Sequence, residues 1–209
     1  MYFFIYLYDM QQELKSQLTK QHIVNEAFTL FYEHGFKSTS INDVMKAAKM
    51  TKGAFYHHYK SKQQLGIEVI ELKVQKRVYD GMILPLKQQG NAMEILESTF
   101  LNRLKSFPFY DKQHGCPMNN LINEIGNYEA SYQLALKHIV EKWKSALVLL
   151  IKRGQDENTI KKDVSGEAIA IYLISAFEGI RGLRKLYNDD NILDQYIKGL
   201  SLYLHQLKV

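Results

Sequence analysis

The fold is decided by residues 38–65, which read STSINDVMKAAKMTKGAFYHHYKSKQQL. Apolar residues at helical spacing predict two short helices here, one over residues 41–49 capped by Ser40 and one over residues 52–59 capped by Thr51. A turn of about three residues separates them, and polar and aromatic groups crowd the second helix. This pattern is typical of a helix-turn-helix, whose second helix lies in the major groove of duplex DNA.

The charge of the chain is concentrated in the same stretch. The 209 residues include 27 Lys and Arg against 22 Asp and Glu, a net charge of +5. Residues 37–62 contain six lysines and a single acid, Asp43, so this segment accounts for the whole excess. A segregated basic segment indicates a nucleic-acid contact surface, whereas a solvated lysine-rich face is the plainer alternative.

The flanking sequence predicts further helices and an all-α fold. Residues 19–34 show a helical period between a capping Thr19 and Gly35, and a longer helix follows Ser61. Beyond a break at residues 85–91, the same apolar stripe recurs in five segments. We expect about nine helices in total, with the later ones over Ala92–Ser106, Cys116–Asn127, Ser131–Arg153, Gly166–Leu186 and Asn191–Lys208, and an irregular loop over Phe107–Gly115.

Residues 19–66 resemble the DNA-binding domain of the tetracycline-repressor (TetR/AcrR) family. The resemblance is carried by Gly35-Phe36 after the first helix, by Thr39-Ser40 before the second, and by the run from Gly53 to Lys62. Lys49 departs from the family pattern, which usually has Gly in this turn. A lysine there must adopt a conformation that Gly adopts more easily.

The resemblance implies a ligand-responsive transcriptional regulator, a repressor rather than an enzyme, and we expect no cofactor. The sole cysteine and the lack of C-x-x-C spacing in turn predict a cytoplasmic protein without a metal site. It implies a three-helix helix-turn-helix domain within residues 1–66 and a helical ligand-binding and dimerisation domain over residues 67–209. Its partners would be double-stranded palindromic operator DNA, a small-molecule effector and a second copy of the chain. The implied DNA contacts are Ser40, Tyr56, His58 and Lys62 to phosphates and Lys52, Ala54 and His57 to bases. The hydroxyl of Thr51, at the start of the recognition helix, is a further candidate donor to DNA.

The last two predicted helices carry more apolar surface than one core needs. Within residues 166–186, Ile169, Leu173 and Phe177 belong to a bulky stripe, whereas Gly179 and Gly182 belong to a stripe of small residues. Small residues permit close approach of another helix, so we expect a subunit interface here. The resemblance agrees, because family members dimerise through a four-helix bundle of their last two helices.

Signals for a ligand site are weaker. Aromatic and long apolar side chains of the second domain predict an apolar cavity, although such stripes also build ordinary cores. They favour an apolar or aromatic effector, with Arg103, Arg181 or His114 as partners for an anionic group. The candidate lining residues are Phe100, Leu104, Phe107, Met118, Tyr128, Trp143, Leu147, Tyr172 and Phe177.

Cys116 supports a different class of function. It is the sole cysteine, and a neighbouring base could activate it, with His114 two residues away. The alternative is therefore an all-α small-molecule-binding protein, or a Cys116-dependent enzyme, without DNA binding. The absence of a completing carboxylate at a readable spacing favours a packing role for the thiol.

The first residues form an aromatic run, Tyr2 to Tyr8, that is followed by Met10. It lacks the basic start and the longer apolar core of a secretory signal, and it is shorter than the roughly 20 apolar residues of a membrane span. We therefore expect no membrane partner. We also expect residues 1–9 to be a mobile extension, or untranslated if synthesis begins at Met10, which intact-mass measurement would decide.

Overall fold

A computed structural model describes residues 2–187 and 189–209 of the chain. Its regular structure is helical, and across these residues the β pairing is limited to an isolated bridge between Ile160 and Lys208. The elements follow the order α1 (Tyr2–His34), α2 (Ile41–Ala47), α3 (Lys52–His58), α4 (Lys62–Val69), α5 (Gln75–Val78), α6 (Ala92–Lys105), α7 (Phe109–His114), α8 (Pro117–Ile125), α9 (Ala130–Asp156), α10 (Gly166–Leu183) and α11 (Asn191–Gln206).

The helix that follows α3 is long and irregular. Ser61 caps it, as predicted, by accepting a hydrogen bond from the Gln64 amide at 3.2 Å. The backbone then runs without a break from α4 through a π-helical segment η1 (Ile70–Val74), α5 and a second π-helical segment η2 (Tyr79–Ile83). The predicted domain division at residue 66 therefore falls inside a continuous helix and remains a proposal.

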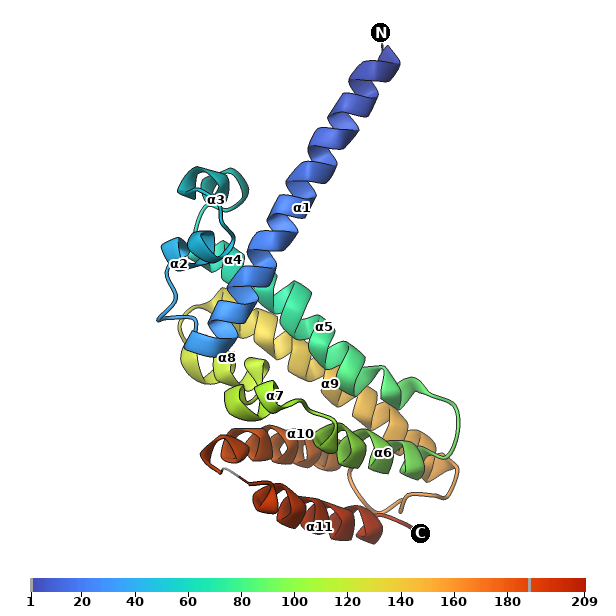
Figure 1. Ribbon diagram of the computed structural model, residues 1–209. Helices are drawn as coiled ribbons and strands as arrows, with labels where there is room; N and C mark the ends of the chain where they lie inside the picture. The colour runs from blue at the N-terminus through green and yellow to red at the C-terminus, as the bar shows by residue number, and fades with distance from the viewer. Residues whose placement is uncertain (1, 188) are drawn as a thin grey trace.

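The elements are arranged along the length of the molecule (Figure 1). The first half of α1 projects away from the body, with α2 and α3 beside its middle, while α10 and α11 lie at the opposite end. Helix α9 runs along α5 and connects the two regions. A single cluster of buried side chains extends through both, and its largest fully buried members include Tyr59, Tyr132, Phe100, Trp143 and Phe177.

Two predicted boundaries were wrong. Helix α1 begins at Tyr2 rather than at Thr19, because residues 2–18 contain no glycine or proline that would stop a helix from extending. The predicted loop over residues 107–115 contains α7, which begins after Pro108 and ends at Gly115, whose φ of +77° suits a helix stop. The remaining predicted helices agree with the structure to within a few residues.

The two predicted faces of α10 are confirmed as inner and outer surfaces. The bulky residues Ile169, Leu173 and Phe177 are buried in the core, and Gly179 on the small stripe is exposed.

No helix in the described part of the chain is both long and apolar enough to cross a membrane.

Candidate nucleic-acid interface and effector cavity

The start of α2 is fixed by a reciprocal pair of hydrogen bonds. The Ser40 hydroxyl accepts from the Asp43 amide at 3.2 Å, and the Asp43 carboxylate accepts from the Ser40 amide at 2.8 Å. The Ser40 hydroxyl also donates to this carboxylate at 2.7 Å, and these bonds hold the pKa of Asp43 below its usual value. Ser40 thus lies exposed at the helix start, where the resemblance places a phosphate, but its hydroxyl is engaged with Asp43.

The turn into α3 depends on an unusual residue. Lys49 has φ of +54°, the left-handed conformation that the sequence required of it. Thr51 then caps α3 by accepting from the Ala54 amide at 3.4 Å. The turn therefore sets the angle between α2 and α3 at the cost of a strained lysine.

Helix α3 presents one face to the core and one to solvent. Phe55 and Tyr59 are buried with ring centroids 5.5 Å apart, as the i, i+4 spacing predicts. The opposite face is open: Tyr56 is 61% exposed, and a Cβ built at Gly53 would meet only the Thr51 hydroxyl, at 3.6 Å, outside the backbone of its own helix. The predicted DNA contacts Thr51, Lys52, Tyr56 and His57 are exposed, and Ala54 and His58 are half-buried.

The two histidines of α3 lie next to each other, with ring centroids 4.9 Å apart. Burial lowers the pKa of His58, and the neighbouring His57 and Lys20 lower it further. His58 is therefore a neutral imidazole near neutral pH, and a hydrogen bond from it to a phosphate would use a ring N–H.

Lys62 lies differently from the other lysines of this segment. Its ammonium donates to the carbonyl of Phe36 and stands 4.3 Å from the centroid of the Phe36 ring. Burial lowers the pKa of this ammonium. The side chain thus ties the turn after α1 to the start of α4, which differs from the phosphate contact that the resemblance implies.

The remaining basic residues of the segment form an unneutralised surface. Five of them are exposed, and none forms an ion pair with any residue that the structure describes. They are distributed over the α1–α2 turn, α2, the following turn and both ends of α3, and they are Lys37, Lys46, Lys49, Lys52 and Lys60.

Sequence reasoning missed the contacts that join this unit to the rest of the protein. The Tyr32 hydroxyl of α1 lies 2.8 Å from an Asp111 carboxylate oxygen and 2.7 Å from the Gly115 carbonyl, and it can donate to either. Arg77 bonds the same oxygen of Asp111, and Arg181 donates to the Gly115 carbonyl at 2.7 Å. These partners are 34 to 83 positions apart in sequence, so no local spacing signals them.

A second missed contact lies nearby. The carboxylate of Glu124 in α8 accepts from the backbone amides of Phe36, at 2.8 Å, and of Lys37. The turn that leads into α2 is therefore held by α8 as well as by Lys62.

A small enclosed cavity lies between α5, α6, α8, α9 and α10. It has a volume of about 20 Å³, room for about one water molecule. Four of the nine predicted ligand residues line it, Phe107, Met118, Trp143 and Phe177. Phe100, Leu104 and Leu147 are buried but are not among the lining residues, and Phe100 packs on Trp143 with centroids 6.3 Å apart.

The other two candidates do not reach this cavity. Tyr128 is 63% exposed, with the Lys37 ammonium 5.6 Å from its ring. Tyr172 is 49% exposed, on α10, and packs against Tyr203 of α11. Aromatic identity alone did not distinguish these surface tyrosines from cavity residues.

Cys116 lines the cavity, but its thiol is poorly suited to act as a nucleophile. Its side chain is buried beside Glu178, and burial together with that carboxyl group raises the pKa of the thiol to about 12. A thiol rather than a thiolate is present at neutral pH, so the group is a weak nucleophile. The described residues contain no cluster of three or more His, Cys, Asp or Glu side chains suited to a metal ion.

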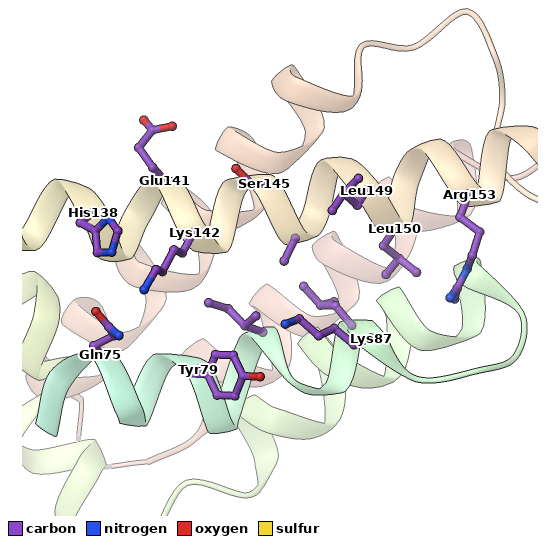
Figure 2. A pocket seen from close by; sticks show the side chains of 13 residues that line it. Gln75, Tyr79, Lys87, His138, Glu141, Lys142, Ser145, Leu149, Leu150 and Arg153 are labelled. Carbon is purple, nitrogen blue, oxygen red and sulfur yellow. The ribbon is translucent and has the colours of Figure 1, made fainter. Parts of the chain in front are cut away.

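A larger, open groove lies on the other side of the α4–η2 helix. It has a volume of about 710 Å³ and runs between that helix and α9 (Figure 2). Gln75 and Tyr79 line one side, and His138 and Lys142 line the other. None of the predicted ligand residues lines this groove, whereas four of them line the enclosed cavity.

Comparisons with known proteins match both regions. A model described as bacterial regulatory proteins of the tetR family matches residues 23–69, and one described as a tetracyclin repressor-like C-terminal domain matches residues 96–200. The transposon Tn10 TetC protein of Escherichia coli is 31% identical over 75% of this chain and 78% of its own. The transcriptional repressor DhaR of Mycobacterium sp. strain GP1 is 24% identical over 85% of this chain and 88% of its own.

The fold is shared with solved structures as well. A transcriptional regulator from Chloroflexus aurantiacus superposes with a TM-score of 0.82, covering 93% of this chain and 98% of that one at 23% identity. The superposition extends beyond the helix-turn-helix to the helices that follow it.

Proposed function

Because this chain belongs to the tetR family of bacterial regulatory proteins, we propose that it represses transcription by holding a palindromic operator as a homodimer and releases it when a small effector binds. The protein is a DNA-binding regulator and not an enzyme. It acts in the cytoplasm, where its DNA lies. In this proposal residues 1–66 bind DNA, and residues 67–209 bind the effector and the second subunit.

One observation carries the DNA-binding part of this proposal. Five exposed lysines, none in an ion pair with a described residue, lie between the end of α1 and the residues after α3, and the outer face of α3 offers Lys52, Tyr56 and His57 to a groove. An unneutralised surface of this kind attracts phosphates, and the donors at the start of α3 can reach base edges. The alternative of a DNA-blind enzyme is not favoured, since Cys116 is a buried, protonated thiol.

The outer face of α10 and α11 supports the dimer. Ile171 and Leu202 are 48% and 69% exposed, and Leu186 after α10 is 79% exposed. Gly179, Gly182 and Gly199 have open space where a side chain would stand. A partner copy laid on this face would bury these apolar side chains and approach closely over the glycines.

The effector part of the proposal rests on the enclosed cavity. Its apolar lining of Phe107, Trp143 and Phe177 suits an apolar or aromatic compound. Two of its polar residues, Arg77 and Arg181, also belong to the network that reaches Tyr32 of α1. Binding there can bias the position of the DNA-binding unit, so effector and operator compete without sharing a site.

The test is selection of bound duplexes from a random DNA library by the full-length protein. We expect an enriched palindrome, retained at low salt and released as the salt concentration rises. A double variant Lys52→Ala/His57→Ala should lose the enrichment, and the matched surface variant Lys142→Ala on α9 should keep it. Failure of the wild-type protein to enrich any sequence would overturn the proposal.

A further inference from the structure

Arg103 lines the enclosed cavity and forms no ion pair with any described residue. Its Nε atom is buried without a hydrogen-bond partner, and no carboxylate within the described residues pairs with its guanidinium. Gly81 makes room for it, because a Cβ there would stand 3.0 Å from Arg103 Nη2. The charge of Asp111 acts on this guanidinium, but no carboxylate bonds it, so the half-buried group can take an incoming acceptor.

Two more arginines, Arg77 and Arg181, line the same cavity. The guanidinium carbons of Arg103 and Arg181 stand 4.8 Å and 4.3 Å from the centroid of the Phe107 ring. Burial lowers the pKa of Arg103, and the charges of Arg77 and Arg181 lower it further. This region therefore carries closely spaced positive charges that a bound anion would relieve.

The acids nearby do not balance these charges. Asp111 is bonded to Arg77, and the Arg181 guanidinium lies 4.0 Å from the same Asp111 oxygen. Glu178 is 8% exposed, and its Oε2 atom has no hydrogen-bond partner. Burial raises the pKa of Glu178, whereas the charge of Arg181 and a hydrogen bond with Cys116 lower it. Three arginines, Arg77, Arg103 and Arg181, therefore face two carboxyl groups, those of Asp111 and Glu178, and the Glu178 Oε2 atom is still free to form a hydrogen bond.

The walls define the rest of the ligand. Trp143, Phe107 and Phe177 supply flat apolar surfaces, and the indole Nε1 of Trp143 is a further buried donor without a partner. The cavity admits only about one water molecule, so a ligand must push a wall outward. One wall contains the π-helical segments η1 and η2, whose irregular backbone is of a kind that recurs at functional sites.

We propose that the effector is a small organic carboxylate with a flat apolar body, and that its carboxylate binds Arg103 and competes with Asp111 for Arg77 and Arg181. The proposal rests on the function proposed above and gives its effector a chemical class and its release a route. Once the effector draws Arg77 and Arg181 away, Asp111 and the Gly115 carbonyl lose the guanidinium groups that hold them in place. The Tyr32 hydroxyl bonds both acceptors, so it transmits their displacement to α1.

The protein carries its own reporter for the test, since Trp143 is its sole tryptophan and lines the cavity. Benzoate, benzamide and benzylamine have the same apolar body and differ in charge. Titrated against tryptophan fluorescence, benzoate should bind at least about tenfold more tightly than either of the others. Arg103→Gln should remove this preference, and Lys105→Gln, a matched loss of charge at an exposed site of α6, should retain it.

The second arm measures release from a selected operator. Benzoate should displace the wild-type protein from DNA. Tyr32→Phe should bind benzoate with affinity within about twofold of wild type, yet should need at least about tenfold more of it for release. Equal affinity for benzamide and benzoate, a preference unaffected by Arg103→Gln, or no fluorescence change with any probe would each overturn the carboxylate assignment. Operator binding in the absence of any probe is measured separately, and its loss alone would count against the proposed function.

Discussion

At the scale of single residues, Lys49 is the clearest point of strain. Its φ of +54° places a side-chain-bearing residue in the left-handed region, which costs about 1–2 kcal/mol for most residues. Lys49→Gly should therefore raise the free energy of unfolding by about 0.5–1 kcal/mol, after allowance for the extra freedom of glycine in the unfolded chain.

Urea denaturation of two variants tests this. Lys46→Gly removes the same charge from the regular helix α2 and should lower the free energy of unfolding by about 1 kcal/mol. A loss of stability in both variants would show that the turn does not favour glycine.

Lys52 and Lys62 should behave as different kinds of residue. Lys52→Ala should reduce discrimination at particular base pairs by about 1–3 kcal/mol, since its exposed ammonium can reach base edges. Lys62→Ala should instead lower the free energy of unfolding by about 1 kcal/mol, because the Phe36 carbonyl loses a charged donor.

Competition with point-substituted operators and urea denaturation, applied to both variants, separate the two roles. If Lys62→Ala kept wild-type stability and lowered the salt slope of binding by about one unit, Lys62 would be a phosphate contact after all.

The residues that could be predicted are those that local spacing determines. Phe55 and Tyr59 lie four positions apart, and Ser40 and Thr51 stand directly before apolar periods, so the sequence indicates their roles. Tyr32, Asp111 and Glu124 act only through partners far away along the chain, and nothing in their neighbourhood distinguishes them from surface polar residues.

At the scale of elements, the same limit explains the misplaced helix boundaries. The periodic apolar face of α1 starts at Ile23, so the pattern marks where the helix becomes buried and not where it starts. In α7, Asp111 is the buried residue, and a helix that buries a carboxylate shows no apolar period. Both helices are defined by backbone geometry that the hydrophobic pattern does not report.

The outer face of α10 gives a prediction about assembly. Gly179→Glu should produce folded monomers, because a carboxylate buried without a partner between closely packed helices costs several kcal/mol. Within one subunit a Cβ built at this exposed position has open space around it, so we expect the single chain to tolerate the change.

Sedimentation velocity of the variant measures the outcome. Leu149→Glu, an equivalent change at a 69% exposed position of α9, should remain a dimer. A folded Gly179→Glu dimer would exclude this face from the interface.

At the scale of the whole molecule, the dimer must place two copies of α3 in successive major grooves on one side of the duplex. This requires a separation of about 34–36 Å, and the operator should be a palindrome with half-sites about one helical turn apart. Footprinting of the selected operator checks the spacing. Insertion of about five base pairs between the half-sites, half a turn, should abolish binding by the dimer, and its persistence would show that the half-sites are contacted independently.

The bonds that tie α1 and its turn to α7 and α8 also bear on engineering the protein. Tyr32 bonds Asp111, the Phe36 amide bonds Glu124, and Gln63 bonds Ser131. Three side chains or amides before residue 67 therefore depend on hydrogen-bond partners that lie later in the chain. A chimaera that received its first 66 residues from a relative would carry donors positioned for the hydrogen-bond partners of that relative. To change the promoter that the protein recognises, it is therefore better to substitute only the outward-facing side chains of α3. Such substitutions leave all three hydrogen bonds in place.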